Sequence, residues 1–178
     1  MAPFSEHHDD SPFWRFSLRF YSRAAVSAAC LVLQDEAGVD VNLMLFLLYL
    51  AEHKRSVSEA EVSRLDQAVA EWRDQVVKPL RGLRRALKSG VGEIPGEVSE
   101  SFRAQIKRLE LDSEKIEQHV LERFAYATLG AEAASRMDAA HANIAAYAGC
   151  LGSFPDSARS TILSAFNEFG RHHPVGIA

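Results

Sequence analysis

The segment from Asp40 to His53 constrains the fold more than any other, because it is long enough for a helix yet has no polar side. Every residue from Leu43 to Ala51 is apolar apart from the hydroxyl group of Tyr49. A helix that is hydrophobic all round must be enclosed by protein or by lipid. The run is too short for lipid, because a membrane-spanning helix needs about 20 apolar residues. We therefore expect a soluble protein whose other elements surround a helix at about 40–53.

The remaining patterned segments have the three- and four-residue spacing of amphipathic helices. Ser11 and Pro12 predict a helix start, and Ser58 opens a capping box with Glu61. Pro79 predicts a kink within the long helix that follows. No segment shows the alternation of a strand. The sequence thus predicts an all-α fold, a bundle of about seven helices around the buried central helix.

Length and composition indicate one ordinary domain. The chain has 178 residues, of which 47% are hydrophobic and 25% charged, and we predict a single helical domain over residues 11–170. Disordered tails are expected at residues 1–10 and 171–178. Cys30 and Cys150 stand in apolar helical patterns and are expected to be buried free thiols. With a start that lacks a signal peptide, these features favour a cytoplasmic protein.

The most distinctive string runs from Gln34 to Asn42 and predicts a turn between two helices. Gly38 fits the left-handed conformation that ends a helix, and Asp40 can cap the next one. The polar side chains of this string could also converge on a small pocket or hold a partner's backbone. The candidate pocket residues are Gln34, Asp35, Asp40 and Asn42. Capping and pocket formation both remain open.

A row of cations, termed the basic face, follows Pro79. Its members are spaced so that they share one side of a helix, and they are Arg81, Arg84, Arg85 and Lys88. Such a row suits a phosphate-bearing ligand, RNA or an acidic protein surface. The alternative is a solvated face that the helix dipole favours and that Glu97, Glu100 or Glu110 neutralises. A formal net charge of −4 argues against a generic nucleic-acid binder.

Motifs for metal binding and catalysis are missing from the sequence. A di-iron bundle needs paired Glu-x-x-His motifs, and only Asp138-x-x-His141 has that spacing. Four glutamates that could supply carboxylates lie off the apolar stripe and are expected to face water; they are Glu110, Glu114, Glu117 and Glu122. A nucleophile elbow and a phosphate-binding loop are also missing. We predict no metal, no cofactor and no catalytic residue, and the sequence favours a protein that is not an enzyme.

Three strings together carry a family resemblance. They are Phe13-Trp14-x-Phe16-Ser17, Cys30-Leu-x-Leu-Gln-Asp-x-x-Gly38-x-Asp40-Val-Asn42-Leu, and Val77-x-Pro79-Leu80-Arg81-x-x-Arg84-Arg85-x-Leu87-Lys88. Over about residues 13–125 the chain resembles a small family of proteobacterial proteins classed as a domain of unknown function. The resemblance implies a bacterial, soluble, helical protein and implies no activity.

Two functions of different classes fit these observations. The leading hypothesis is a non-enzymatic interaction or regulatory module that presents the basic face to an acidic protein or to RNA. The alternative is a bundle that binds a small molecule, or an enzyme, with an apolar cavity beside Asn42, Tyr49 and Trp72. The candidate pocket residues would form its polar rim. A homodimer formed by the apolar surplus of the first three helices is a third prediction.

Overall fold

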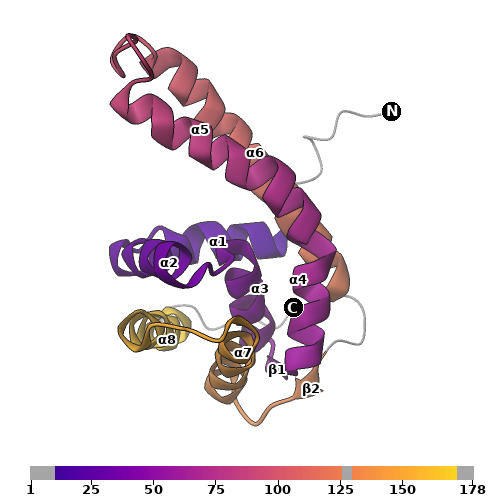
Figure 1. Cartoon of the computed structure of the whole chain (residues 1–178). Coiled ribbons are helices and arrows are strands. Elements are labelled where there is room, and N and C mark those ends of the chain that lie inside the picture. The colour runs from indigo at the N-terminus through magenta and orange to yellow at the C-terminus, as the bar shows by residue number, and fades with distance from the viewer. Residues whose placement is uncertain (1–10, 126–129, 172–178) are drawn as a thin grey trace.

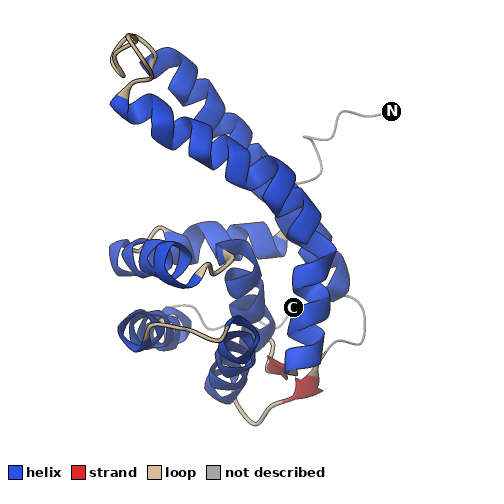
Figure 2. Cartoon of the chain, in the orientation of Figure 1, coloured by secondary structure: helices blue, strands red, loops and turns tan. Residues whose placement is uncertain are grey.

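The computed structural model describes residues 11–125 and 130–171, and within them the chain is all-α apart from one short strand pair (Figures 1 and 2). The helices are α1 (Pro12–Tyr21), α2 (Ala24–Ala37), α3 (Val41–Glu52), α4 (Glu59–Trp72), the π-helix η1 (Arg73–Val77), α5 (Lys78–Ser89), α6 (Glu100–Ala125), α7 (Arg136–Leu151) and α8 (Asp156–Arg171). The predicted fold class is confirmed. The predicted tails lie outside the described residues, except Arg171, which ends α8.

A two-residue strand pair departs from the expectation that no strand forms. β1 (Arg55–Ser56) follows α3 and pairs antiparallel with β2 (Ala131–Glu132). The buried Asn143 of α7 holds this end of the molecule together, because its Nδ2 donates to the carbonyl oxygens of Leu47 and Arg55, both at 2.9 Å. Two residues are too few to show the alternation by which a strand is recognised in sequence.

Helix α3 occupies the centre of the fold, as its composition predicts. All its side chains from Asn42 to Leu48 are buried, together with Leu50 and Ala51. It packs against α1, α6 and α7, and Figure 1 shows it between the other layers. Burying one large aliphatic side chain contributes about 1.5–3 kcal/mol. The leucines of α3 therefore stabilise the contacts of several surrounding helices at once.

The turn between α2 and α3 forms by the local chemistry that its sequence predicts. Gly38 has φ 65°, in the left-handed region, and the Val39 N–H donates to the Leu33 carbonyl oxygen at 3.2 Å. The Asp40 carboxylate caps α3 by accepting from the N–H groups of Asn42 at 2.9 Å and Leu43 at 3.2 Å. The turn thereby fixes a carboxylate inside the protein, with its second oxygen directed to other partners.

Helices α4 and α5 form one continuous rod, with η1 between them and Pro79 in the first turn of α5. The π-helical turn η1 directly precedes the turn that holds Pro79, where the sequence predicts a kink, and such turns often occur at functional sites. The rod pairs with α6 to form an arm that extends away from the bundle (Figure 1). Apolar side chains remain exposed along this arm: Leu83, Val91, Ile94, Val98, Phe102 and Leu109.

Two further expectations concern the cysteines and the membrane. Cys30 is buried in the core as predicted, whereas Cys150 is exposed near the end of α7, where its Sγ donates to the Glu59 carbonyl oxygen at 3.5 Å. No helix in the described ranges is by itself both long enough and apolar enough to cross a membrane. Among the helix pairs of the described segments, α1 and α2 taken together pass that test by length and composition, and they are bent by 97°.

Candidate functional site: a cavity beside a buried charge network

A cavity of about 300 Å³ lies between the layer of α1, α2 and α3 and the arm of α5 and α6; it is termed the main cavity. Its volume is at the lower end of the range of ligand pockets, about 300–1,000 Å³. The apolar lining consists of Trp14, Leu18, Tyr21, Leu31, Val41, Leu45 and Leu111. The polar lining consists of Ser17, Gln34, Asn42, Arg81, Arg84, Arg85, Lys107, Glu110, Glu114 and Gln118. The main cavity is therefore apolar on one part and charged on another.

Helix α1 is held over this cavity by a contact with the far end of α6. The Ser11 hydroxyl group donates to Glu122 Oε2 at 2.7 Å, and the Phe13 N–H donates to Glu122 Oε1 at 3.1 Å. Ser11 also caps α1 by accepting from the Trp14 N–H at 3.1 Å. One carboxylate thus satisfies donors at the start of α1 and fixes the wall that carries Trp14 and Ser17.

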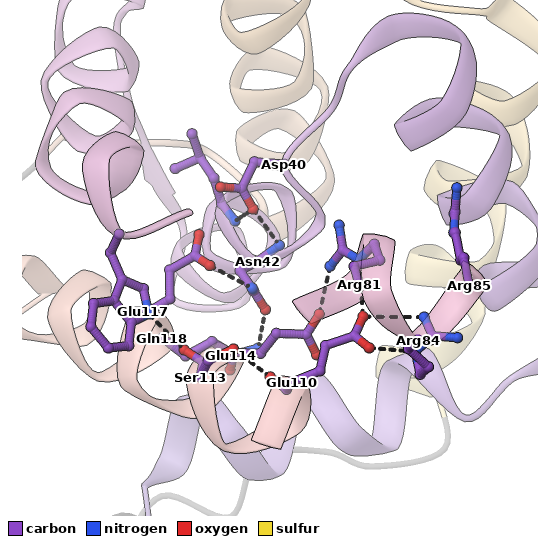
Figure 3. A network of polar contacts seen from close by, with 12 residues as sticks. Asp40, Asn42, Arg81, Arg84, Arg85, Glu110, Ser113, Glu114, Glu117 and Gln118 are labelled. Atoms are coloured by element: carbon purple, nitrogen blue, oxygen red, sulfur yellow. Dashed lines mark hydrogen bonds and ion pairs between the residues drawn. The ribbon is translucent and has the colours of Figure 1, made fainter. Parts of the chain in front are cut away.

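The basic face divides into a paired half and an exposed half. Arg81 donates from Nε to Glu110 Oε1 at 3.1 Å and from Nη2 to Glu114 Oε1 at 2.6 Å. Arg84 donates from Nε and Nη2 to the same Glu110 carboxylate (Figure 3). Desolvation by burial raises the pKa of Glu114. Neutralisation by Glu110, one alternative drawn from the sequence, therefore applies to these two arginines.

The other two cations of the basic face point to the surface. The half-exposed Arg85 forms an ion pair with Asp35, Nη2 to Oδ1 at 3.1 Å. Lys88 is exposed at the end of α5. Asp35, expected at a pocket rim, thus lies on the outside and lines neither of the cavities described here.

Three of the four glutamates expected to face water are buried instead. Glu110 and Glu122 are each 6% exposed and Glu117 is 1% exposed, whereas Glu114 is half-buried. The expectation was wrong because α6 packs against α1, α3 and α4 as well as α5, so more of its circumference is covered than one stripe. Arginines and amide groups supply the partners that buried carboxylates require.

A hydrogen-bonded chain of side chains links the main cavity to Asp40. Gln118 Nε2 donates to Asn42 Oδ1 at 2.8 Å, and Asn42 Nδ2 donates to Glu117 Oε2 at 3.0 Å (Figure 3). Desolvation raises the pKa of Glu117, and the charge of Asp40 and a hydrogen bond with it raise that pKa further. The raised pKa favours the neutral acid form of Glu117 beside the Asp40 carboxylate.

Asp40 forms an ion pair with Arg73, the first residue of η1. Arg73 Nη1 lies 2.9 Å from Asp40 Oδ2 and 2.6 Å from Asp66 Oδ1. The Asp40 side chain is 4% exposed and the Asp66 side chain 40% exposed. The π-helical turn thereby directs a guanidinium group at the cap of α3, and the buried charges are paired.

A smaller cavity of about 80 Å³ adjoins the main cavity, and the two share Gln34, Val41, Asn42 and Arg81. Asp40, Arg73 and Glu117 line only the smaller one. Two of the predicted pocket residues, Gln34 and Asn42, thus reach both cavities, and Asp40 reaches the smaller one.

Tyr49 and Trp72, also expected beside the cavity, line neither. Tyr49 packs against the rings of Phe13 and Phe16, and the Trp72 Nε1–H donates to the Ser113 carbonyl oxygen at 3.0 Å. Both side chains therefore pack within helix interfaces away from the two cavities.

Sequence reasoning did not identify Ser17, Arg73, Glu117 or Gln118 as site residues. One signal was present on α6, where polar residues stand in phase with buried apolar ones. The buried positions of this helix include Ile106, Glu110, Ser113, Glu117 and Leu121. Polar residues at core spacing indicate a buried network, because they are retained inside a protein only with partners. The described ranges hold no group of three or more His, Cys, Asp or Glu side chains arranged to bind a metal ion.

A comparison with known proteins matches the region that forms the site to one protein family. A family model described as "Protein of unknown function (DUF2390)" matches residues 12–121, more than half of the chain. The match includes every residue that lines the two cavities, and it ends before α7 and α8. No curated protein and no solved structure matches the chain significantly.

Proposed function

Because the chain belongs to the DUF2390 family of proteins of unknown function, we propose its function from geometry: it binds a small amphipathic anion in the main cavity. The observation that carries the proposal is the lining of that cavity, in which aromatic and aliphatic side chains face a cluster of cations. Ligand sites in helical bundles have this composition, mostly apolar with a few convergent polar groups.

The charges of the lining favour an anion over a cation. Four cationic side chains line the main cavity against two carboxylates, Glu110 and Glu114. The Nη1 groups of Arg81 and Arg84 make no hydrogen bond with the described residues, so each can still donate. Arginine donors of this kind bind carboxylate and phosphate groups. An apolar body would lie against Trp14 and Leu45.

A bulky side chain at the cavity mouth tests the proposal. Leu31 lines the main cavity and is 47% exposed, so Leu31→Trp should narrow the entrance without disturbing the core. We expect decanoate, measured by isothermal titration calorimetry, to bind this variant about tenfold more weakly than the natural protein, a loss of about 1.4 kcal/mol.

The matched control is Leu109→Trp. Leu109 is a similarly exposed leucine on α6 that does not line the main cavity, so its replacement should change decanoate affinity less than about twofold. Equal losses in the two variants would place the binding elsewhere. No decanoate binding to the natural protein would refute the proposal outright.

The second candidate function is docking of an acidic protein surface on the basic face. Arg81 and Arg84 line the main cavity and pair with Glu110 and Glu114, so an acidic partner on the outer surface would contact mainly Arg85 and Lys88. The exposed apolar residues of the arm, which continue beyond Lys88, favour a partner there, because exposed apolar patches often mark interaction sites. RNA and a second copy of the chain are the competing occupants.

Charge reversal at one exposed cation tests this second candidate. Lys88→Glu should weaken the binding of poly-L-glutamate about two- to fivefold at low salt, the usual worth of one surface ion pair. Arg64→Glu, at an exposed cation of α4, serves as the control and should have little effect. If polyuridylate binds and poly-L-glutamate does not, the partner is RNA; equal effects of the two substitutions would remove the basic face from consideration.

A bacterial cytoplasmic setting is part of the proposal. The resemblance of the three sequence strings to proteobacterial proteins supports the bacterial origin. Both cysteines are free, and a buried free thiol such as Cys30 suits a reducing compartment. The homodimer through the first helices also remains a proposal, supported by the exposed Leu18, Tyr21, Leu31 and Val32 of α1 and α2.

A further inference from the structure

Two buried polar atoms in the lining of the main cavity have no hydrogen-bond partner. They are Ser17 Oγ on α1 and Gln118 Oε1 on α6, and each residue is only 3% exposed. Buried polar groups in native proteins nearly always have partners, so two unpaired atoms on residues that line a cavity require an explanation. The inner end of the cavity is taken as the part lined by these two buried residues, and its mouth as the part lined by the exposed Arg85 and Lys107.

The orientation of the Gln118 amide is fixed by the chain of side chains behind it. Its Nε2 donates to Asn42 Oδ1, and Asn42 in turn donates to Glu117. The oxygen of Gln118 is therefore the atom left for the cavity, and it can only accept a hydrogen bond. Ser17 can donate or accept. Together these atoms match a group that both donates and accepts.

We propose that the inner end of the main cavity receives a hydroxyl group, so that the ligand is an amphipathic anion with a hydroxyl at its apolar end. This inference rests on the proposed function and adds the chemistry of the second end of the ligand. The hydroxyl group would donate to Gln118 Oε1 and accept from Ser17 Oγ. The anionic group would lie toward the cations of the lining, Arg81, Arg84, Arg85 and Lys107, with the apolar body between Trp14 and Leu45.

A trapped water molecule is the competing occupant, because buried waters commonly satisfy such atoms. The two possibilities predict different affinities for ligands with and without a hydroxyl group. A hydroxyl-bearing ligand replaces both hydrogen bonds of the water, whereas a purely apolar ligand end leaves the two protein atoms unpaired or the water in place. If the proposal is right, a ligand with the terminal hydroxyl group should bind more tightly than the same ligand without it.

The test compares ω-hydroxydecanoate with decanoate by isothermal titration calorimetry. The natural protein should bind the hydroxylated probe about tenfold more tightly, the worth of about two hydrogen bonds. In Ser17→Ala the preference should fall to about twofold or less, because one of the two bonds is lost and the other weakens. That variant should unfold at a urea concentration no lower than the natural protein, since the Ser17 hydroxyl group has no partner to lose.

Ser113→Ala provides the matched control. The Ser113 hydroxyl group is equally buried but donates to the Glu110 carbonyl oxygen at 2.6 Å and does not line the main cavity. Its removal should lower stability while the tenfold preference persists. Equal affinity for the two probes in the natural protein, with Leu31→Trp still weakening both, would overturn the hydroxyl subsite and leave the proposed function standing. Binding of neither probe would overturn both.

Discussion

Replacing Arg73 with methionine is expected to lower the free energy of unfolding by about 3–5 kcal/mol, because it leaves the buried carboxylate of Asp40 without its cation. The Asp40 side chain is 4% exposed and lies 2.9 Å from the guanidinium group. Its remaining hydrogen-bond partners are neutral donors, the N–H groups of Asn42 and Leu43. Urea denaturation followed by circular dichroism measures the loss.

The double variant Arg73→Met with Asp40→Asn separates this effect from lost packing. Asparagine caps helices about as well as aspartate and carries no charge, so the double variant should recover most of the stability that Arg73→Met loses. The coupling energy between the two sites should then exceed about 1 kcal/mol, as for residues that share one network. A double variant no more stable than Arg73→Met would show that the guanidinium group acts mainly through its packing.

Local sequence signals predicted the parts of the fold that depend on neighbours in the chain. The apolar run of α3 predicts a central helix because no orientation of it could face water. Gly38 and Asp40 predict the turn before it, and both have the predicted roles. The cap at Ser11 and the capping box at Ser58 are confirmed for the same reason. Each of these features is decided within about four residues.

The cavity and its network depend on contacts that no local pattern contains. Glu110 pairs with Arg81 across 29 positions of sequence, and Asn42 bonds Glu117 across 75. The sequence predicts that Arg81 and Glu110 each lie on a helix, but the pairing requires the register of α5 against α6. The π-helical turn sets part of that register, since it inserts a wider turn before α5. The basic face was therefore recognised as a row, while its division into paired and exposed halves was not.

Glu117→Gln is expected to remove the pH dependence that the buried acid imposes on stability. Burial and the Asp40 charge raise the folded-state pKa of Glu117 above the ordinary value of 4.5. Between the ordinary pKa and the raised folded-state pKa, the folded protein holds a proton that the unfolded chain releases. Stability therefore falls as pH rises, by up to about 1.4 kcal/mol per pH unit. The contribution of Glu117 is complete below its ordinary pKa and is lost progressively above it. Glutamine resembles the protonated acid and does not titrate.

Urea denaturation of the natural protein and Glu117→Gln, repeated between about pH 5 and pH 9, measures the difference. At the acidic end the two proteins should be similarly stable. At the alkaline end the variant should be more stable by about 3 kcal/mol or more, because it lacks the loss of stability with rising pH that Glu117 causes. Glu93→Gln, at an exposed position in the loop between α5 and α6, should follow the natural protein throughout. If Glu117→Gln instead loses stability evenly at every pH, Glu117 is charged in the folded state, and the Asp40 network holds two anions rather than one.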